Sequence, residues 1–447
     1  MKNYILLACY FCCAITFAQE ITWDGHVQAT GIFSSEDSLP FWFYNNTNTE
    51  IGQESDYAGL AAIHGNYQLK DSVYLSAGIT AMARNGFEDD IQRRDLYLQF
   101  KNRWLKATLG SKAADVVSNG LSTSNKNFIF STNARPLPGI LLEANEPLVI
   151  SKTFAFDWGI GHYMLNDERY VEDVRVHYKR LGLITTLSAK SKLTLQLQHY
   201  AQWAGTAPDG TELQSDFEAF TNVFIASKGD KEGSFGEALN ALGNHIGTYF
   251  IEYEVLLKPG LLSIYHDHPF EDGSGTRFAN FPDGIWGISF EPTNKKLITQ
   301  VTYEYIDSSD QSGTDGNSGF DGYFGNSTYR SGWTYEGQVI GLPFILNDPS
   351  IVLTDINSPF ISNRSRVHHF GLMGSVKQFD WKLKTSYFTN FGTYRKPFDP
   401  KVNSWLNYAS LAYKTPHYGT ITLLGGFDTV DVGVDNTAVA LQYGYTF

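Results

Sequence analysis

The last twelve residues of the chain alternate between two kinds of side chain. Every second position from Val439 to Phe447 is aliphatic or aromatic, whereas the positions between them are small or polar. Successive side chains of a β-strand point to opposite faces, so this segment predicts a strand with one oily and one polar face. A strand between lipid and a polar lumen needs this pattern, although an ordinary half-buried strand shares it.

The same alternation recurs in segments 193–198, 248–257 and 379–391. In the last two segments the polar face carries full charges, namely Glu252, Glu254, Lys382 and Lys384. An unpaired charge is costly in an apolar core but not in a water-filled or polar-packed interior. These segments therefore favour strands whose inner face is polar.

Connections between the predicted strands fall into short turns and long loops, which alternate along the chain. Among the short turns is Asn145-Glu146-Pro147. The long loops are expected at 34–57, 84–93, 111–138, 165–172, 204–244, 269–283, 307–365, 392–402 and 429–435. Short turns at one end and long loops at the other are typical of bacterial outer-membrane barrels.

The strand count, from 21–33 through 436–447, gives about eighteen. The predicted fold is therefore all-β, a closed antiparallel transmembrane β-barrel with both ends of the chain on the same side. The stretch 330–365 has room for a further hairpin. A barrel of this size is too wide for wall side chains to fill, so its lumen is either a channel or plugged.

One long loop, 204–244, carries a helical pattern. Apolar residues recur at helical spacing at Phe217, Phe220, Phe224 and Ile225, and a second group follows at Phe235, Ala238, Leu239 and Leu242. This insertion is expected to be a helical plug at the barrel mouth or lumen, with an extracellular helical flap as the alternative.

Residues 1–18 read as a secretory signal peptide, which leaves 19–447 as the barrel. Lys2 supplies the positive charge, an apolar run follows, and Thr16-Phe17-Ala18 forms a small-x-small cleavage site. A membrane anchor and a lipoprotein signal are the competing interpretations. All three cysteines lie within this segment, so the remaining chain can form neither disulfides nor thiolate metal sites.

The formal net charge is −13, and 15% of residues are aromatic. A chain this acidic, without a basic face, argues against nucleic acid as a partner. Abundant Tyr, Trp and Phe suit contact with outer-membrane lipid. The C-terminal Phe447, with Tyr443 and Tyr445 upstream, resembles the closing-strand signal through which the barrel assembly machinery acts on outer-membrane barrels.

The segment 265–291 holds the densest cluster of polar and aromatic residues. His266 and His268 share one strand face, with Asp267 on the opposite face. Two imidazoles and a carboxylate can bind a metal, but a third ligand at defined spacing is missing, and a hydrogen-bonded histidine pair is the alternative. No G-x-S-x-G motif occurs, and no pair of carboxylates stands out. We therefore predict no catalytic residues, no metal and no cofactor.

Carbohydrate binding fits the remaining residues, because aromatic rings stack on sugars while polar side chains bind hydroxyl groups. An outer interfacial girdle of aromatic residues is the alternative for each ring. The candidate polysaccharide-binding residues are His266, Asp267, His268, Asp272, Arg277, Asp283, Trp286, Trp42, Tyr329 and Trp333.

Several motifs, in this order, resemble the Wzi family of capsule assembly proteins in its Bacteroidetes-type form. They are Pro40-Phe41-Trp42 and the segments 135–140, 265–275, 282–287, 331–335 and 340–343. The resemblance implies an outer-membrane barrel of eighteen strands, partly occluded by helices, that binds capsular polysaccharide as a lectin. The chain differs from enterobacterial members in lacking a clear helical segment near its N-terminus.

The function predicted is a non-enzymatic outer-membrane barrel, with loops facing the cell surface, that binds capsular or exopolysaccharide and helps attach or assemble capsule. The alternative is a porin or substrate-specific channel, which the barrel width favours. An outer-membrane hydrolase is a third hypothesis. The sequence does not distinguish which polysaccharide is bound.

Overall fold

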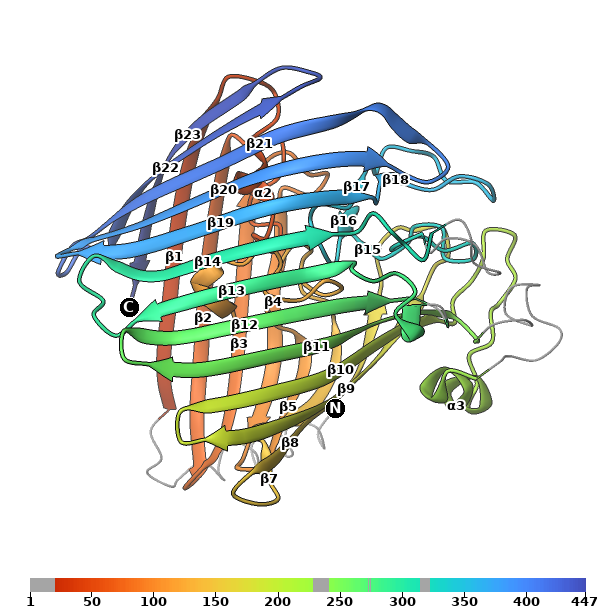
Figure 1. Ribbon diagram of the computed structural model, residues 1–447, viewed down its shortest axis with the longest axis horizontal. Helices are drawn as coiled ribbons and strands as arrows, with labels where there is room; N and C mark the ends of the chain where they lie inside the picture. Colours follow the sequence, from red (N-terminus) through yellow and green to blue (C-terminus); the bar gives the residue numbers. More distant parts are fainter. Residues whose placement is uncertain (1–20, 228–240, 272, 274, 314–321) are drawn as a thin grey trace, which may run out of the picture.

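The computed structural model describes residues 21–227, 241–271, 273, 275–313 and 322–447, and most of them form one closed antiparallel barrel (Figure 1). The predicted signal peptide lies outside the described residues. The wall strands are β1 (Ile21–Ser34), β2 (Tyr57–Lys70), β3 (Val73–Arg84), β4 (Ile91–Lys101), β5 (Leu105–Ser111), β6 (Gly139–Ala144), β7 (Leu148–Val149), β8 (Phe154–Leu165), β9 (Val174–Ser188), β10 (Ser191–Trp203), β11 (Asn244–Leu257), β12 (Gly260–Phe270), β13 (Gly284–Pro292), β14 (Ile298–Asp307), β19 (Ser365–Val376), β20 (Phe379–Gly392), β21 (Pro397–Lys414), β22 (Thr420–Val430) and β23 (Asn436–Thr446).

Each wall strand pairs with its neighbours along the chain, and the ring closes where β1 pairs with both β2 and β23. Strands β6 and β7 both pair with β8 and so share one place in the wall, which gives eighteen places among the described residues. The seam ends on the C-terminal residue, whose N–H donates to the Gly25 carbonyl at 3.0 Å. A Cβ at Gly25 would lie 2.4 Å from the Phe447 ring, so glycine makes room for that ring.

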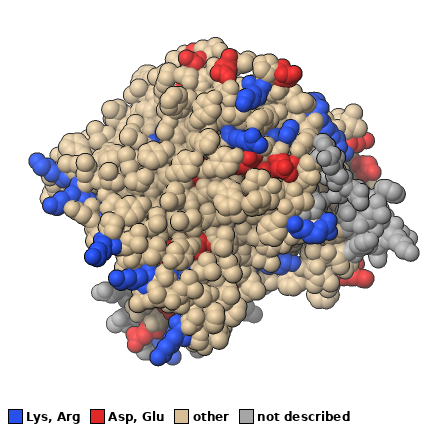
Figure 2. All heavy atoms as spheres, in the orientation of Figure 1, with Lys and Arg blue, Asp and Glu red and all other residues tan. Residues whose placement is uncertain are grey.

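The two faces of the wall follow the alternation of the sequence. On β23, Ala438 and Ala440 are buried on the lumen side, whereas Val439 and Leu441 are 49% and 60% exposed on the outside. On β11, Glu252 faces inward and pairs with Lys126 at 2.8 Å. Figure 2 shows one face of the molecule, with charged side chains toward its ends and a broad band between them that carries few. The predicted oily exterior and polar interior are confirmed.

Two predicted boundaries are wrong. The turn expected at 145–147 is only an interruption between β6 and β7, because Pro147 cannot donate to the ladder, and the chain turns at 150–153 instead. The long loop expected at 392–402 shrinks to 393–396, because β21 extends down to Pro397. The other long loops lie within a few residues of their predicted bounds.

The remaining elements are short and lie in the long loops. The stretch 330–365 does hold extra hairpins, but they form two small separate sheets and not wall strands. These elements are α2 (Phe41–Tyr44), η1 (Val117–Gly120), α3 (Phe217–Ile225), η2 (Gly275–Arg277), β15 (Thr334–Tyr335), β16 (Gln338–Val339), β17 (Leu346–Asn347) and β18 (Phe360–Ser362). In the described part of the chain, no helix is long and apolar enough to span a membrane.

Candidate functional site

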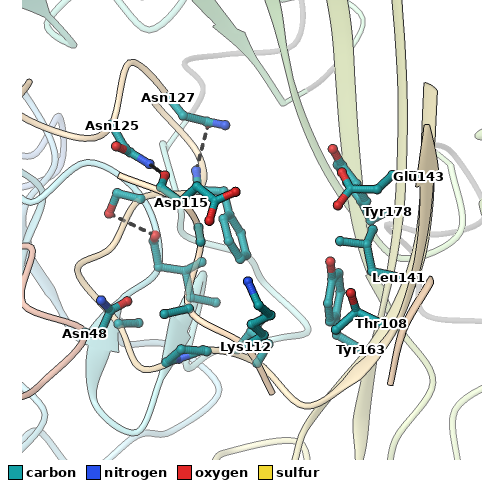
Figure 3. A pocket seen from close by; sticks show the side chains of 18 of the residues that line it. Asn48, Thr108, Lys112, Asp115, Asn125, Asn127, Leu141, Glu143, Tyr163 and Tyr178 are labelled. Carbon is teal, nitrogen blue, oxygen red and sulfur yellow. Dashed lines mark hydrogen bonds between the residues drawn. The ribbon is translucent and has the colours of Figure 1, made fainter. Parts of the chain in front are cut away.

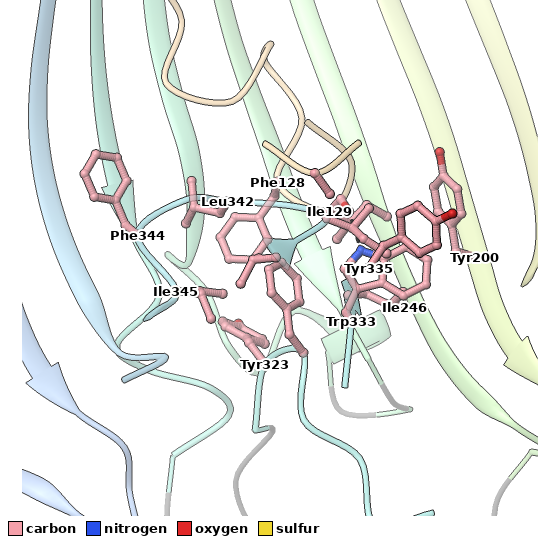
Figure 4. Packing of buried hydrophobic residues seen from close by; sticks show 14 of the residues in the cluster. Phe128, Ile129, Tyr200, Ile246, Tyr323, Trp333, Tyr335, Leu342, Phe344 and Ile345 are labelled. Atoms are coloured by element: carbon pink, nitrogen blue, oxygen red, sulfur yellow. Dashed lines mark hydrogen bonds between the residues drawn. The ribbon is translucent and has the colours of Figure 1, made fainter. Parts of the chain in front are cut away.

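Three long loops, 35–56, 112–138 and 322–359, fold into the lumen and pack into one body, here called the plug. Figure 4 shows residues of the last two loops packed together beside wall residues Tyr200 and Ile246. Its centre is apolar: Phe128, Ile129, Trp333, Leu342 and Phe344 are at most 1% exposed. Backbone hydrogen bonds join the loops to one another, as from Leu342 N–H to the Phe128 carbonyl at 2.9 Å. Burial of this many large side chains gives the plug an apolar core, which continues into inward-facing wall residues such as Ile246, Ile306 and Val367.

Inward carboxylates of the wall hold the plug by accepting hydrogen bonds from its N–H and O–H groups. The Glu304 carboxylate on β14 accepts from Ser122 Oγ at 2.7 Å, from the Thr123 N–H at 2.7 Å and from Thr123 Oγ1 at 2.5 Å. On β12, Asp267 accepts from the Phe128 N–H at 2.7 Å. On β22, Asp428 accepts from the Phe41 N–H at 2.6 Å. These carboxylates serve as fixed acceptors for the plug backbone.

The aromatic residues predicted to bind sugar are part of the plug. Trp42, from α2, is 4% exposed and donates from Nε1 to Ser386 Oγ at 3.1 Å. Trp333 is fully buried and donates from Nε1 to the Ile129 carbonyl. Tyr329 is 2% exposed, with its hydroxyl donating to the Ala204 carbonyl. In this conformation all three rings stabilise the plug.

The histidine cluster is split by the wall of the barrel. Asp267 faces the lumen, as its bond to the plug requires, whereas His266 and His268 lie on the outer face of β12. The His266 ring stacks on Trp286 of β13 with centroids 3.6 Å apart. Nδ1 of His268 lies 3.1 Å from the Asp283 carbonyl oxygen. In the described part of the chain, no group of three or more His, Cys, Asp or Glu is placed to hold a metal.

Asp283 is a buried residue at the loop end of β13. Its carboxylate accepts from the N–H groups of Asp310 and Gln311 and from the Tyr323 hydroxyl. Burial raises the pKa of Asp283 to about 7, although these donors act in the opposite direction. Arg277 is exposed in η2, and Asp272 lies outside the described residues. The candidate residues of segment 265–291 therefore do not converge on one pocket.

A cavity of about 290 Å³ separates the plug from one side of the wall (Figure 3). The plug contributes Asn48, Asn125, Asn127 and Phe130, and the facing wall strands contribute tyrosines. Tyr178 and Tyr200 stack with centroids 4.5 Å apart, and Phe130 stacks on Tyr200 at 5.4 Å. Ring faces beside amides and charges are the groups that bind carbohydrates. We call this space the lumen cavity.

Paired charges line the wall of the lumen cavity. Glu143 on β6 pairs with Lys106 at 2.8 Å and with Arg180 at 3.2 Å. Arg180 also pairs with Asp157 at 2.9 Å. Because the cations and carboxylates pair with each other, this wall presents a polar surface whose charges are largely balanced.

A second pocket, of about 330 Å³, opens among the long loops and is here called the mouth pocket. Arg330, Arg395 and Lys396 line it, together with amide, hydroxyl and aromatic side chains of 326–327, 357–363 and 393–394, and no carboxylate is among its described lining. Nε of Arg330 and Oδ1 of Asn363 are buried without a hydrogen-bond partner among the described residues. The pocket can therefore accept hydroxyl groups and anionic groups of a ligand.

Helix α3 of the 204–244 insertion lies at the rim, on the outer side of the wall (Figure 1). Its buried residues Ala219 and Val223 pack on Ala201 and Trp203 of the outer face of β10. Phe217 is 82% exposed and Ile225 63% exposed. The helical prediction is confirmed for 217–225, and the structure favours the flap over the lumen plug. Of the second predicted group, Phe235, Ala238 and Leu239 lie outside the described residues.

Several residues of the two pockets were missed by the sequence analysis. The lumen cavity uses tyrosines that point inward from neighbouring strands, Tyr163, Tyr178 and Tyr200. The sequence does indicate them, because an aromatic residue on the polar face of a strand is unexpected in an empty lumen. The mouth pocket brings Arg330 and Lys396 together from loops far apart in the sequence, and no local pattern marks that encounter.

The sequence matches the family described as capsule assembly protein Wzi over residues 29–344. No curated protein matches it. Among solved structures, the chain is similar to OccK3 (OpdO) of Pseudomonas aeruginosa, with TM-score 0.52, 11% identity and 96% of each chain covered. It is also similar to OccK5 (OpdH) of Pseudomonas aeruginosa, with TM-score 0.50 and 11% identity over 96% of this chain and 98% of that chain. At such identity these likenesses show the outer-membrane barrel fold alone.

Proposed function

We propose that this chain, which belongs to the Wzi family of capsule assembly proteins, binds a surface polysaccharide and helps attach or assemble capsule. The observation that carries this proposal is the mouth pocket, a polar, cationic pocket on the long-loop end of an outer-membrane barrel whose lumen holds a folded plug. With the loop end facing the cell surface, as in bacterial barrels generally, the pocket meets extracellular glycan and not periplasmic solutes.

The mouth pocket offers the two kinds of contact that polysaccharides use. Asn326, Asn357 and Ser358 can donate to and accept from sugar hydroxyls, and the Tyr394 ring gives an aromatic surface. Arg330 and Lys396 add positive charge that suits sugar acids, because charge-assisted hydrogen bonds are the stronger ones. Arg364 lies over the Tyr394 ring at 3.7 Å and so holds that ring in place.

The proposed role is binding without turnover. General acid–base chemistry on a glycosidic bond needs two carboxyl groups facing a substrate across a few ångströms. Among the carboxylates that meet the plug, Glu304, Asp267 and Asp428 accept hydrogen bonds from plug donors. In the lumen cavity the Glu143 carboxylate is paired with Lys106 and Arg180, and the mouth pocket has no carboxylate among its described lining residues.

A substrate-specific channel is the second candidate function, and the lumen cavity is the observation that favours it. The cavity has a stacked aromatic wall and balanced charges, as a sugar-conducting path would need. The plug argues against free conduction, since its three loops are joined to each other and to the wall. Single-channel recording in planar bilayers separates the two: steady open currents in the intact protein would favour transport.

The barrel and its terminus also imply partners. Outer-membrane lipid covers the exposed apolar band of the wall, as around Leu441 and Leu423. We propose that the barrel assembly machinery acts on the closing strand through Phe447, which is 64% exposed at the seam beside β1. Deleting Phe447 is expected to lower the amount of folded barrel in the membrane.

Binding of capsular or exopolysaccharide purified from the source bacterium tests the function. The Arg330→Gln, Lys396→Gln double variant is expected to bind about tenfold more weakly, from about 1.4 kcal/mol of lost charge-assisted contact. Lys295→Gln, which removes an exposed cation paired with Glu291 at the turn end, is the matched control and should bind normally. Equal binding by all three proteins, or no binding by the intact barrel, contradicts the proposal.

A cellular measurement complements the binding assay. A strain that lacks the gene, or carries the double variant, is expected to shed polysaccharide into the medium that the intact strain keeps on its cells. Loss of growth on a sugar, with cell-bound polysaccharide unchanged, would support the channel instead.

A further inference from the structure

The outer face of β8–β12 differs from the rest of the lipid-facing wall in its histidines. Six of the eleven histidines of the chain point outward near the loop end of these strands. They are His162, His177, His199, His245, His266 and His268. His177, His199 and His268 are buried beneath α3, Phe270 and Phe278. His162, His245 and His266 are partly exposed, and polar-tipped rings of this kind are typical of the level where hydrocarbon meets the headgroups.

Toward the turn end from the histidines, the same strands form an apolar groove of about 510 Å³ on the outside of the barrel. Its walls include Phe156, Leu181, Leu183, Leu197, Tyr249 and Ile251, and His266 and His268 close its upper end. A concave apolar surface within the hydrocarbon layer has room for an acyl chain. We call it the outer groove.

Two cations lie on β9 between the outer groove and the loop end of the strand. Lys179 is two residues from Leu181, so their Cα atoms lie roughly 6.6 Å apart along the strand, and Arg175 follows four residues further. Both face outward, and no carboxylate pairs with either among the described residues. Lys179 donates to the Phe224 carbonyl at the end of α3, and Arg175 donates to the Ser215 carbonyl at 3.3 Å.

An outward cation elsewhere on the barrel shows the usual arrangement. Arg366 on β19 also points outward at the loop end, but it is neutralised by Asp307 at 2.9 Å. Among the described residues, Lys179 and Arg175 have no such carboxylate: they contact only the carbonyls of Phe224 and Ser215 and the rings of Phe224 and Trp203. An anionic group from the membrane would supply the missing negative charge.

We propose that the outer face of β8–β12 binds an anionic lipid of the surrounding leaflet, with an acyl chain in the outer groove and a phosphate against Lys179 and Arg175. The outer groove and the two cations call for different ligand groups: the groove fits an acyl chain, and the cations fit an anion at the level of the histidines. A lipid that carries both groups fits both. This site lies outside the barrel and does not depend on polysaccharide binding in the mouth pocket.

Native mass spectrometry of the intact detergent-solubilised barrel tests the site. The probes are bisphosphorylated lipid A and its dephosphorylated form, which has the same acyl chains. The intact protein is expected to retain the bisphosphorylated form preferentially. Arg175→Gln with Lys179→Gln should reduce that retention about 25-fold, since each of the two cations near a membrane surface contributes about a fivefold change in binding.

Two further variants guard against effects of misfolding. Leu197→Trp fills the outer groove without touching α3 and should weaken retention of both lipid forms. Arg366→Gln is the matched control and should change neither. Equal retention of the two lipid forms by the intact barrel, or an unchanged preference in the double variant with the native heat-dependent gel mobility, would overturn the proposal.

Discussion

The two sides of the lumen differ in how many side-chain hydrogen bonds their strands make to the plug. On one side, strands β12, β14, β20 and β22 each bond the plug through a side chain, and Glu304 alone accepts three hydrogen bonds from it. On the other side, no side-chain hydrogen bond among the described residues links β5, β6, β8 or β9 to the plug. We call these the anchored side and the cavity side.

The difference lies in where the wall charges find their partners. Carboxylates of the anchored side accept from N–H groups of the plug, which cannot be moved without leaving those groups unsatisfied. Carboxylates of the cavity side pair with cations of neighbouring strands, as Glu143 does with Lys106 and Arg180. Because the charges of this wall pair with one another, they do not bond the plug, and the space left beside the plug is the lumen cavity.

Removing the central side chain of the plug should release the plug from both sides of the wall. Trp333→Ala removes a fully buried indole, which typically costs about 4 kcal/mol, so both sides should lose their hold. We expect steady conductance in planar bilayers and protease cleavage within 322–359. Trp405→Ala takes the same indole from the lipid-facing wall, where Trp405 is 55% exposed, and should leave conductance at the level of the intact protein.

A pair of carboxylate variants tests the two sides separately. Glu304→Ala strands buried donors of Ser122 and Thr123 and should weaken plug docking by about 3 kcal/mol. Glu143→Ala, on the cavity side, removes a carboxylate whose partners are the wall cations Lys106 and Arg180 and no plug group, so it should weaken docking by about 1 kcal/mol or less. Conductance and protease sensitivity of 112–138 measure both. If the two variants behaved alike, the distinction between the sides would not hold.

The loop end of the anchored side should depend on pH through Asp283. Its pKa is raised to about 7 in the folded protein, above its ordinary value, so the protonated folded form is favoured. The stability that this proton contributes is complete below about pH 4 and is lost as pH rises through about 7, which amounts to roughly 2 kcal/mol between pH 5 and pH 8. Hydrogen exchange of 308–313 should therefore quicken with pH beyond the intrinsic rate.

Asp283→Asn supplies the control for this dependence, because an amide keeps an acceptor oxygen but does not ionise. The excess exchange above pH 7 should disappear in the variant. The same slope in both proteins would show that another group titrates.

Alternation along single strands predicted the barrel, its size and the polarity of its two faces, because each of these is a local property of sequence. It also placed Asp267 opposite His266 and His268. The sequence predicts a helical plug or flap in 204–244, and the lumen is filled by other loops: amphipathic spacing in 217–225 is visible locally, whereas 112–138 and 322–359 become a core only when they meet. Aromatic rings such as Trp42, Trp333 and Tyr329 suit a sugar site, but all three are buried in the plug core. The sequence shows the residue type and not the burial.

The smallest expected effect concerns one of the hydrogen bonds between the plug and β10, the strand next to the cavity side. Nδ2 of Asn127, in the plug, donates to Oε1 of Gln198 on β10 at 3.1 Å, at the edge of the lumen cavity. Gln198→Ala removes this acceptor but leaves Asn127 beside a water-accessible space, so docking should weaken by only about 0.5 kcal/mol. Asn127→Ala should cost more, since Oδ1 of Asn127 also accepts from the N–H groups of Ile129 and Phe130. Protease sensitivity of 112–138 ranks the two. A large effect of Gln198→Ala would mean that the cavity side anchors the plug as firmly as the other.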